Sequence, residues 1–176
     1  NHSGDSQSSA RNLDRSYMNC TTAEKDLKQR FEEIYERGQL PLIKDIERLA
    51  FGSDYGASSW TTRTEADNVC QSLELRSGHL LLDVGGGSGR LGLYMATQSG
   101  CDVVLVDFPR AALEVAIDRA AQDQLGDRSW AGVADAASLP FDKTAFDAVS
   151  HSDILFCLPR KCETLASLVV EAGLKQ

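Results

Sequence analysis

A glycine-rich segment at Leu80–Arg90 (LLLDVGGGSGR) carries the residues with the clearest potential for chemistry. Glycines alternate at positions 85, 87 and 89 after a short apolar run, and Asp83 lies two places before the first of them. Because glycine has no side chain, such a turn lets backbone N–H groups approach a ligand closely at the start of a helix. The segment therefore predicts a ligand-binding turn between a buried strand and a helix, with a simple tight turn as the alternative.

The spacing of these glycines does not fit the two common phosphate-binding motifs. A dinucleotide fingerprint that began at Gly85 would require glycine at position 90, where the sequence has Arg90. A P-loop would require Lys and then Ser or Thr after its last glycine, but Leu93 and Tyr94 follow Gly92. A carboxylate two places before the first glycine would also repel a pyrophosphate and suits a ligand that carries positive charge. A nicotinamide oxidoreductase therefore remains only a weak alternative.

Three further segments with acidic or polar residues follow the glycine-rich turn. They are VVLVDFPRAAL with Asp107, ADAASLPF with Asp135, and FDAVSHSDILFCL with Ser150 and His151. In their order and spacing, the four motifs resemble those of the class I S-adenosylmethionine-dependent methyltransferases that act on small molecules. The resemblance extends over roughly residues 79–160.

This resemblance implies S-adenosylmethionine as the cofactor and methyl transfer to a small-molecule acceptor as the reaction, without a metal. The cofactor site that it implies consists of Asp83, Gly85, Gly87, Gly89, Asp107, Phe108, Asp135, Ala136 and Ser150. In such a site Asp107 accepts hydrogen bonds from the ribose hydroxyls and Asp135 accepts one from the adenine amino group, while the Ala136 amide bonds a ring nitrogen. From the residues alone, Asp107 could instead mark a helix start, and Asp135 could be an ordinary loop acid.

His151 is the candidate catalytic residue, because it follows a predicted strand at the end where ligands bind in α/β sheets. An imidazole there can act as a general base on a substrate hydroxyl or amine at neutral pH. It can equally serve as a structural hydrogen-bonding group. Two aromatic residues, Tyr55 and Trp60, are expected either to form a lid over the cofactor or to anchor their loop to the core.

Charge and cysteine content narrow the classes of partner. The chain has 176 residues, with 18 Lys and Arg against 26 Asp and Glu, and a formal net charge of −8, which disfavours nucleic acid. No apolar run approaches the ~20 residues that span a bilayer, which disfavours a membrane. The five cysteines are scattered and the histidines number three, so neither a metal site nor a disulfide framework is expected. Reduced thiols of this kind predict a cytoplasmic protein.

Apolar periodicity predicts the elements that must position these motifs. Strands are expected at 79–84, 102–106, 129–133 and 145–150, separated by helices and followed by a last helix from Pro159. Strands and helices that alternate in this way indicate an α/β fold, a Rossmann-like parallel sheet with flanking helices. The resemblance implies seven strands, so a sheet of about four is expected to be incomplete, either as a C-terminally truncated fragment or as a natural short form.

Three regions are predicted along the chain. Residues 1–20 are expected to be a disordered tail or a remnant of an expression vector, because residues 1–10 are Ser-rich and lack large apolar side chains. Residues 21–77 are expected to hold N-terminal helices and the lid loop. Residues 78–176 are expected to form a partial cofactor-binding domain.

Within the N-terminal helices, particular residues predict where each helix begins. Thr21 with Glu24 predicts a capping box for the first helix, Pro41 opens the second, and Thr64 and Asp67 are candidate caps for the third. The buried side of the second helix is expected to carry Leu42, Ile43, Ile46 and Leu49.

The incomplete sheet has two predicted consequences. Its fourth strand would lie at an unpaired edge, which promotes association. The helices around Phe31–Leu49 could cover that edge, or a second copy could pair across Phe146–Ser150, which makes a homodimer through the exposed edge a candidate assembly. The missing strands also leave a second function open, that of a non-catalytic module that binds S-adenosylmethionine or S-adenosylhomocysteine and acts with a partner chain.

Overall fold

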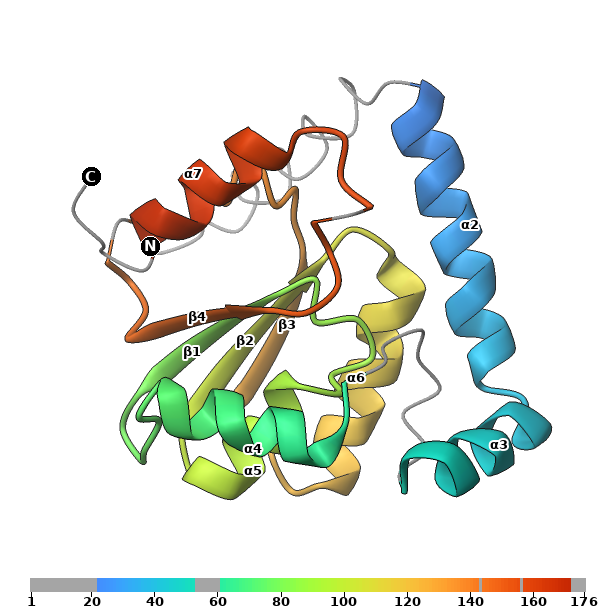
Figure 1. Cartoon of the computed structure of the whole chain (residues 1–176), viewed down its shortest axis with the longest axis horizontal. Coiled ribbons are helices and arrows are strands. Elements are labelled where there is room, and N and C mark those ends of the chain that lie inside the picture. The colour runs from blue at the N-terminus through green and yellow to red at the C-terminus, as the bar shows by residue number, and fades with distance from the viewer. Residues whose placement is uncertain (1–21, 53–60, 143, 156, 172–176) are drawn as a thin grey trace, which may run out of the picture.

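The structure of the protein is a computed structural model that describes residues 22–52, 61–142, 144–155 and 157–171 (Figure 1). The predicted tail, the cap residue Thr21 and the aromatic pair Tyr55 and Trp60 lie outside the described residues. Among the helices that are described, none is both long and apolar enough to cross a lipid bilayer.

Within the described residues, the sheet consists of four parallel strands. They are β1 (Leu80–Val84), β2 (Asp102–Asp107), β3 (Ser129–Val133) and β4 (Ala148–His151). Their order is β3-β2-β1-β4, and Leu82 of β1 lies opposite Val104 on one side and Val149 on the other. The predicted α/β fold, with a parallel sheet of about four strands and flanking helices, is confirmed.

Helices cover both faces of this sheet (Figure 1). The helices of the core are α4 (Arg63–Ser72), α5 (Gly92–Ser99), α6 (Arg110–Gln122) and α7 (Lys161–Glu171). Successive strand residues point to opposite faces, so Leu81 packs in a core cluster with α4, α5 and α6, whereas Leu82 packs with Leu168 of α7. Burial on both faces explains why β1 is apolar at nearly every position.

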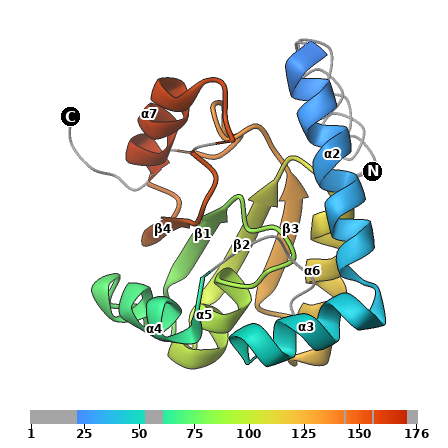
Figure 2. The same ribbon diagram turned by 45° about the vertical axis from the view of Figure 1, so that its right-hand side comes forward.

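Two further helices, α2 (Thr22–Gly38) and α3 (Pro41–Phe51), precede this core. α2 runs beside α6, at the side of the sheet away from β4 (Figure 2). The expectation that these helices cover the β4 edge is therefore wrong, because α2 packs on α6 instead. The expected buried side of α3 is also wrong: Leu42 and Leu49 are 69% and 89% exposed, because the helix turns its Glu47 side toward the protein.

The start of α4 also differs from expectation. Thr62, rather than Thr64, caps the helix in a capping box: its Oγ1 accepts from the Glu65 N–H at 3.3 Å, and Glu65 Oε2 accepts from the Thr62 N–H at 2.7 Å. Asp67 does not cap α4, because its carboxylate accepts a hydrogen bond from the Tyr94 hydroxyl of α5 at 2.8 Å.

The last strand and the last helix begin later than the sequence indicates. β4 starts at Ala148 rather than at residue 145, because the Ala145 N–H donates to Asp142 O at 3.2 Å and closes a turn there. α7 starts at Lys161 rather than at Pro159. The fourth motif therefore begins before β4, continues through this strand and ends in the loop that precedes α7.

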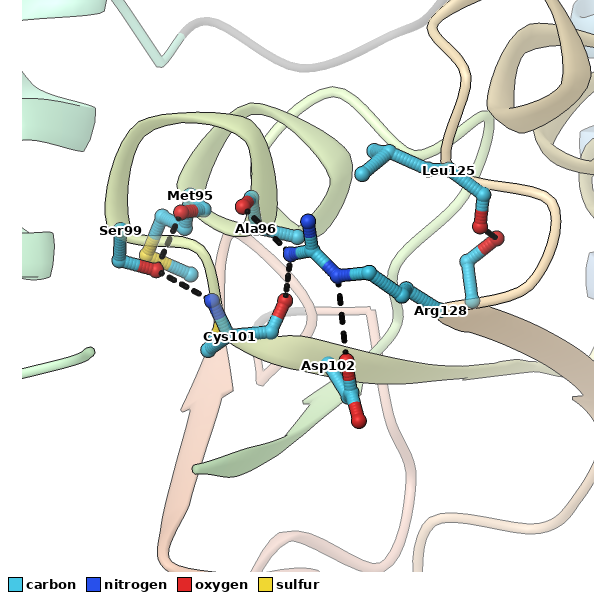
Figure 3. Close-up of polar contacts among 8 residues, drawn as sticks. Met95, Ala96, Ser99, Cys101, Asp102, Leu125 and Arg128 are labelled. Atoms are coloured by element: carbon cyan, nitrogen blue, oxygen red, sulfur yellow. Dashed lines mark hydrogen bonds and ion pairs between the residues drawn. The ribbon is translucent and has the colours of Figure 1, made fainter. Parts of the chain in front are cut away.

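At the amino ends of the strands, Arg128 ties α5 to β2 and β3 (Figure 3). Its guanidinium donates to the carbonyls of Ala96 and Cys101, at 3.2 and 2.6 Å, and to Asp102 Oδ1 at 3.2 Å. Beside it, the Cys101 N–H donates to Ser99 Oγ at 3.2 Å (Figure 3). This end of the sheet is therefore closed by contacts among the protein's own groups.

Candidate functional site

The described residues enclose a cavity of about 350 Å³ at the carboxyl ends of the strands. α2 and α7 stand on either side of these strand ends (Figure 2), and the glycine-rich turn forms part of the cavity wall. The predicted site residues that line the cavity are Asp83, Gly85, Gly87, Asp107, Phe108, Asp135 and Ala136. Ligands of parallel α/β sheets bind at this end, so the cavity is the candidate site.

The glycine-rich turn needs glycine for both conformation and space. Gly85 and Gly87 have positive φ angles of 72° and 54°, which residues with a side chain rarely adopt. A Cβ atom on Gly85 would overlap Ile154, and one on Gly87 would overlap the hydroxyl of Tyr35. The Gly85 N–H donates to Val106 O at 2.8 Å, which fixes the turn to β2. The bare backbone of the turn therefore borders the cavity.

The carboxylate of Asp83 fixes the end of this turn through hydrogen bonds. Its Oδ2 accepts from the Gly92 N–H at 3.0 Å, and its Oδ1 accepts from the Ser150 hydroxyl at 2.7 Å. Burial raises the pKa of Asp83 to about 7, although these two hydrogen bonds favour the charged form. Asp83 therefore connects the start of α5 to β4.

Asp107, at the end of β2, is held by backbone groups. Its Oδ2 accepts from the Gly87 N–H at 2.8 Å, and its Oδ1 accepts from the Phe108 N–H at 2.7 Å. Burial raises the pKa of Asp107 to about 6, and the negative charge of Glu32 adds to the rise. Lys28 lies over the Phe108 ring, with Nζ 5.3 Å from the ring centroid. This carboxylate is directly linked to the glycine-rich turn.

Asp135 lies in the loop after β3. Its Oδ1 accepts from the Ala137 N–H at 2.9 Å, and its Oδ2 forms an ion pair with Arg160. Arg160 immediately precedes α7, so the pair connects the two sides of the cavity. Asp135, Ala136 and Arg160 all line it.

Three predicted site residues lie outside the cavity lining. Ser150 is buried and donates to Asp83, and a Cβ on Gly89 would overlap Leu93 rather than enter the cavity. His151 ends β4 with its side chain exposed to solvent. The residue two places further on, Asp153, does line the cavity and has a positive φ of 59°. The structure thus brings an acid from the fourth motif, and not the predicted base, to the candidate site.

Sequence reasoning missed the whole contribution of α2. The α2 residues that line the cavity are Leu27, Lys28, Arg30, Phe31, Ile34 and Tyr35. In the sequence, Leu27, Phe31 and Ile34 recur at helical spacing and indicate an apolar helix face, but the same pattern serves a face against protein and a face against a cavity. No signal in the sequence separates these two cases.

Arg90 was also missed, because the sequence indicated only that it does not match the dinucleotide fingerprint. Its side chain is buried and lines the cavity. Its Nε donates to Thr61 O at 3.0 Å, and its guanidinium carbon lies 4.8 Å from the centroid of the Phe51 ring. Arg90 thereby joins the cavity to the end of α3 and to the start of α4.

The lining of the cavity combines polar and apolar groups. The carboxylates of Asp107 and Asp135 and the amides of the turn can bond hydroxyl and amino groups. Leu27, Phe31 and Leu158 add apolar surface to the same lining. Such a lining suits a ligand with a polar, hydroxyl-bearing part, and it leaves space for an apolar group beside that part.

Comparison with known proteins gives the family. A model of the methyltransferase domain matches residues 81–171, which are 91 of the 176 residues. The 27-O-demethylrifamycin SV methyltransferase of Amycolatopsis mediterranei is 35% identical over 115 residues, which are 64% of this chain and 42% of that protein. The chain spans about two fifths of the length of the curated relatives it matches.

Solved structures show the same fold at lower identity. A methyltransferase from Thiobacillus denitrificans in complex with S-adenosyl-L-homocysteine is 22% identical with a TM-score of 0.55, over 62% of this chain and 44% of that one. The [4+2]-cyclase SpnF is also 22% identical, with a TM-score of 0.61 over 82% of this chain and 56% of that one. The family model covers β1 through α7, the elements that carry the glycine-rich turn and all four motifs, and the chain therefore belongs to the methyltransferase domain family.

Proposed function

We propose that this chain binds S-adenosylmethionine in the cavity at the strand ends and supports methyl transfer to a small-molecule acceptor. The observation that carries the proposal is the link between Asp107 and the Gly87 N–H, at 2.8 Å. It puts a half-buried carboxylate and a backbone without side chains on one wall of the cavity. When bound, the cofactor would supply a sulfonium-bound methyl group.

The residues present fit this cofactor. At Gly85 and Gly87 the place of a Cβ is taken by Ile154 and by the Tyr35 hydroxyl, so only glycine leaves the backbone of the turn bare at the cavity. We assign Asp107 to the ribose hydroxyls, with Phe108 beside it, and Asp135 with the Ala136 amide to the adenine ring. Asp83, Gly89 and Ser150 would act indirectly, because they shape the turn that holds the cofactor.

The adenine end requires a change of partners. Asp135 is ion-paired with Arg160, so an adenine amino group would have to share or replace that contact. The pair is partly exposed, with 28% and 44% of the two side chains accessible, and such pairs contribute little stability. The exchange therefore costs little free energy.

We place the acceptor against the apolar groups of the cavity lining, between α2 and the segment after β4. Phe31 and Ile34 are only half-buried there, although they are apolar. Burying such surface against a ligand is favourable, which supports an acceptor with an apolar part. The relative from Amycolatopsis mediterranei, whose name gives a small-molecule substrate, is consistent with this class.

We place the general base on the segment after β4. Asp153 lines the cavity, whereas His151 does not, so we favour Asp153 over the predicted His151. Asp153→Asn and His151→Ala variants, tested for turnover with a library of small phenols and alcohols, separate the two. A loss of turnover in His151→Ala alone would return the role to the histidine.

Isothermal titration calorimetry with S-adenosyl-L-homocysteine tests cofactor binding, with NAD as the comparison ligand. Binding of the first and not of the second is expected, because the turn lacks the dinucleotide spacing. Binding of NAD, or of neither ligand, would contradict the proposal.

A non-catalytic binding module is the second candidate function. The observation that favours it is the position of His151 outside the cavity, and the fold alone does not require methyl transfer. The solved neighbour named as a [4+2]-cyclase has the same fold. Stoichiometric S-adenosyl-L-homocysteine binding without methyl transfer to any acceptor tested would favour this candidate.

Other features remain predictions from the sequence. The division at residue 77 is one, although Ala66 of α4 shares a core cluster with Leu81 of β1. A cytoplasmic location, a lack of nucleic acid and membrane partners, and a homodimer through the β4 edge are the others. Sedimentation at micromolar concentration tests the homodimer, and a monomer at all concentrations would contradict it.

A further inference from the structure

The start of α6 is capped by a residue from a distant part of the chain. Pro109 occupies the N-cap position and makes no side-chain cap bond. Instead, Glu32 of α2 accepts from the Arg110 N–H with Oε1 and from the Ala111 N–H with Oε2, both at 2.9 Å. One carboxylate thus satisfies two of the N–H groups that a helix start leaves unpaired, at the end where negative charge is favoured.

The rest of α2 buries few of its described side chains. Among its side chains whose burial is described, only Tyr35 is buried. Leu27, Phe31 and Ile34 are half-buried, because they face the cavity rather than protein. The bidentate bond from Glu32 is therefore a main anchor that keeps these side chains at the cavity wall.

Building on the proposed function, we propose that Glu32 is a positioning residue: it fixes α2 as a wall of the cofactor cavity and so sets cofactor affinity without lining the cavity. Its carboxylate caps the helix that follows Asp107, and its helix carries Tyr35, whose hydroxyl lies against Gly87. Loss of the anchor would therefore loosen both Asp107, which we assign to the ribose, and the glycine-rich turn.

Glu32 also acts on Asp107 through its charge. The titratable groups that face Asp107 are Glu32 from α2, Asp83 from β1 and Cys157 from the segment after β4. The negative charge of Glu32 raises the pKa of Asp107, whereas it is not among the causes that shift the pKa of Asp83. Removing this charge should therefore lower the pKa of Asp107, the acid on which Glu32 acts directly.

The test compares Glu32→Gln, Glu32→Asp and the matched control Glu36→Gln, which removes an exposed carboxylate from the same helix. S-adenosyl-L-homocysteine affinity is measured by calorimetry from pH 5 to pH 8, and thermal unfolding checks the fold. Glu32→Gln should bind about three- to thirtyfold more weakly at pH 8, the effect of a lost cap, and Glu36→Gln should match the unmodified protein.

The pH profile separates positioning from general destabilisation. Affinity should fall as Asp107 takes up a proton near pH 6, and Glu32→Gln should move this midpoint to lower pH. Glu32→Asp keeps the charge but is too short to reach both N–H groups, so it should weaken binding without moving the midpoint. It also provides the decisive measurement if Glu32→Gln does not fold.

The outcomes distinguish failure of the positioning role from failure of the proposed function. If both Glu32 variants bind like the unmodified protein, or if Glu32→Gln weakens binding without moving the midpoint, the positioning role is overturned while the proposed function stands. If the unmodified protein itself does not bind S-adenosyl-L-homocysteine, the proposed function fails first.

Discussion

The two ends of β2 carry the same residue type in opposite surroundings. Asp102 begins the strand and pairs with Arg128, whose guanidinium also bonds the carbonyls of Ala96 and Cys101 (Figure 3). Asp107 ends the strand and accepts only from the backbone N–H groups of Gly87 and Phe108, with no ion pair to it among the described residues.

The difference shows how one strand serves stability at one end and binding at the other. The guanidinium of Arg128 donates its hydrogen bonds to groups of the protein, so this contact is complete without a ligand. Asp107 borders a cavity of about 350 Å³, and a carboxylate has more acceptor sites than the two N–H groups use. Its raised pKa, about 6, reflects the free energy that burial costs there.

The largest effect is expected from Gly87→Val at the binding end. The new side chain would meet the Tyr35 hydroxyl and force valine into a positive φ, so S-adenosyl-L-homocysteine affinity should fall roughly a hundredfold or more. Calorimetry checks this, with Gly132→Ala as the control, since an added Cβ there meets nothing within 4 Å. A folded Gly87→Val protein with normal affinity would mean that the turn is not part of the site.

Asp107→Ala should weaken binding by about 1.5–3 kcal/mol, the scale for hydrogen bonds to a charged group. The matched variant at the other end of the same strand, Asp102→Ala, should leave the affinity unchanged. Equal losses of affinity in the two variants would contradict the assignment of binding to one end of β2.

The buried carboxylates of the binding end should also make stability depend on pH. Burial raises the pKa of Asp83 from 3.8 to about 7, so the folded protein binds this proton more tightly than the unfolded chain does. Stability should therefore fall as pH rises from about 4 to 7, by at most ~1.4 kcal/mol per pH unit for this group. Asp107 contributes in the same direction up to about pH 6.

Asp83→Asn isolates this contribution, because an amide can keep the acceptor for Gly92 while its NH₂ faces the Ser150 oxygen. Its free energy of unfolding, measured by urea at pH 5 and pH 7.5, should fall less over this interval than that of the unmodified protein. An unchanged difference between the two pH values would show that Asp83 does not carry the dependence.

The smallest effect on binding is expected from Arg128→Ala. Loss of its bonds to two carbonyls and to Asp102 should lower the free energy of unfolding by about 1–3 kcal/mol, because these contacts are only partly shielded from solvent. S-adenosyl-L-homocysteine affinity should not change. A matching loss of affinity would indicate that the closed end of the sheet supports the site at a distance.

The sequence by itself determined the sheet and the part of the cavity lining that follows its strands. Buried runs such as LLLDV and DVVLV, separated by helices, allow little other than parallel strands, and parallel strands bring their carboxyl ends to one edge. Gly85, Asp107 and Asp135 each follow such a run, so their arrival at one cavity follows from local pattern alone. The alternation of glycines is also a local requirement, which the positive φ angles explain.

Only the tertiary structure decided what each helix face meets. The apolar sides of α2 and α3 look alike in sequence, yet Phe31 borders the cavity while Leu49 is 89% exposed. The anchor of α2 is a contact between Glu32 and residues 78 and 79 positions away, and the exposed placement of His151 depends on where β4 ends. Apolar periodicity shows that a helix face is apolar, but it does not show which surface that face contacts. The hydrophobic effect is non-directional, so the partner depends on long-range packing.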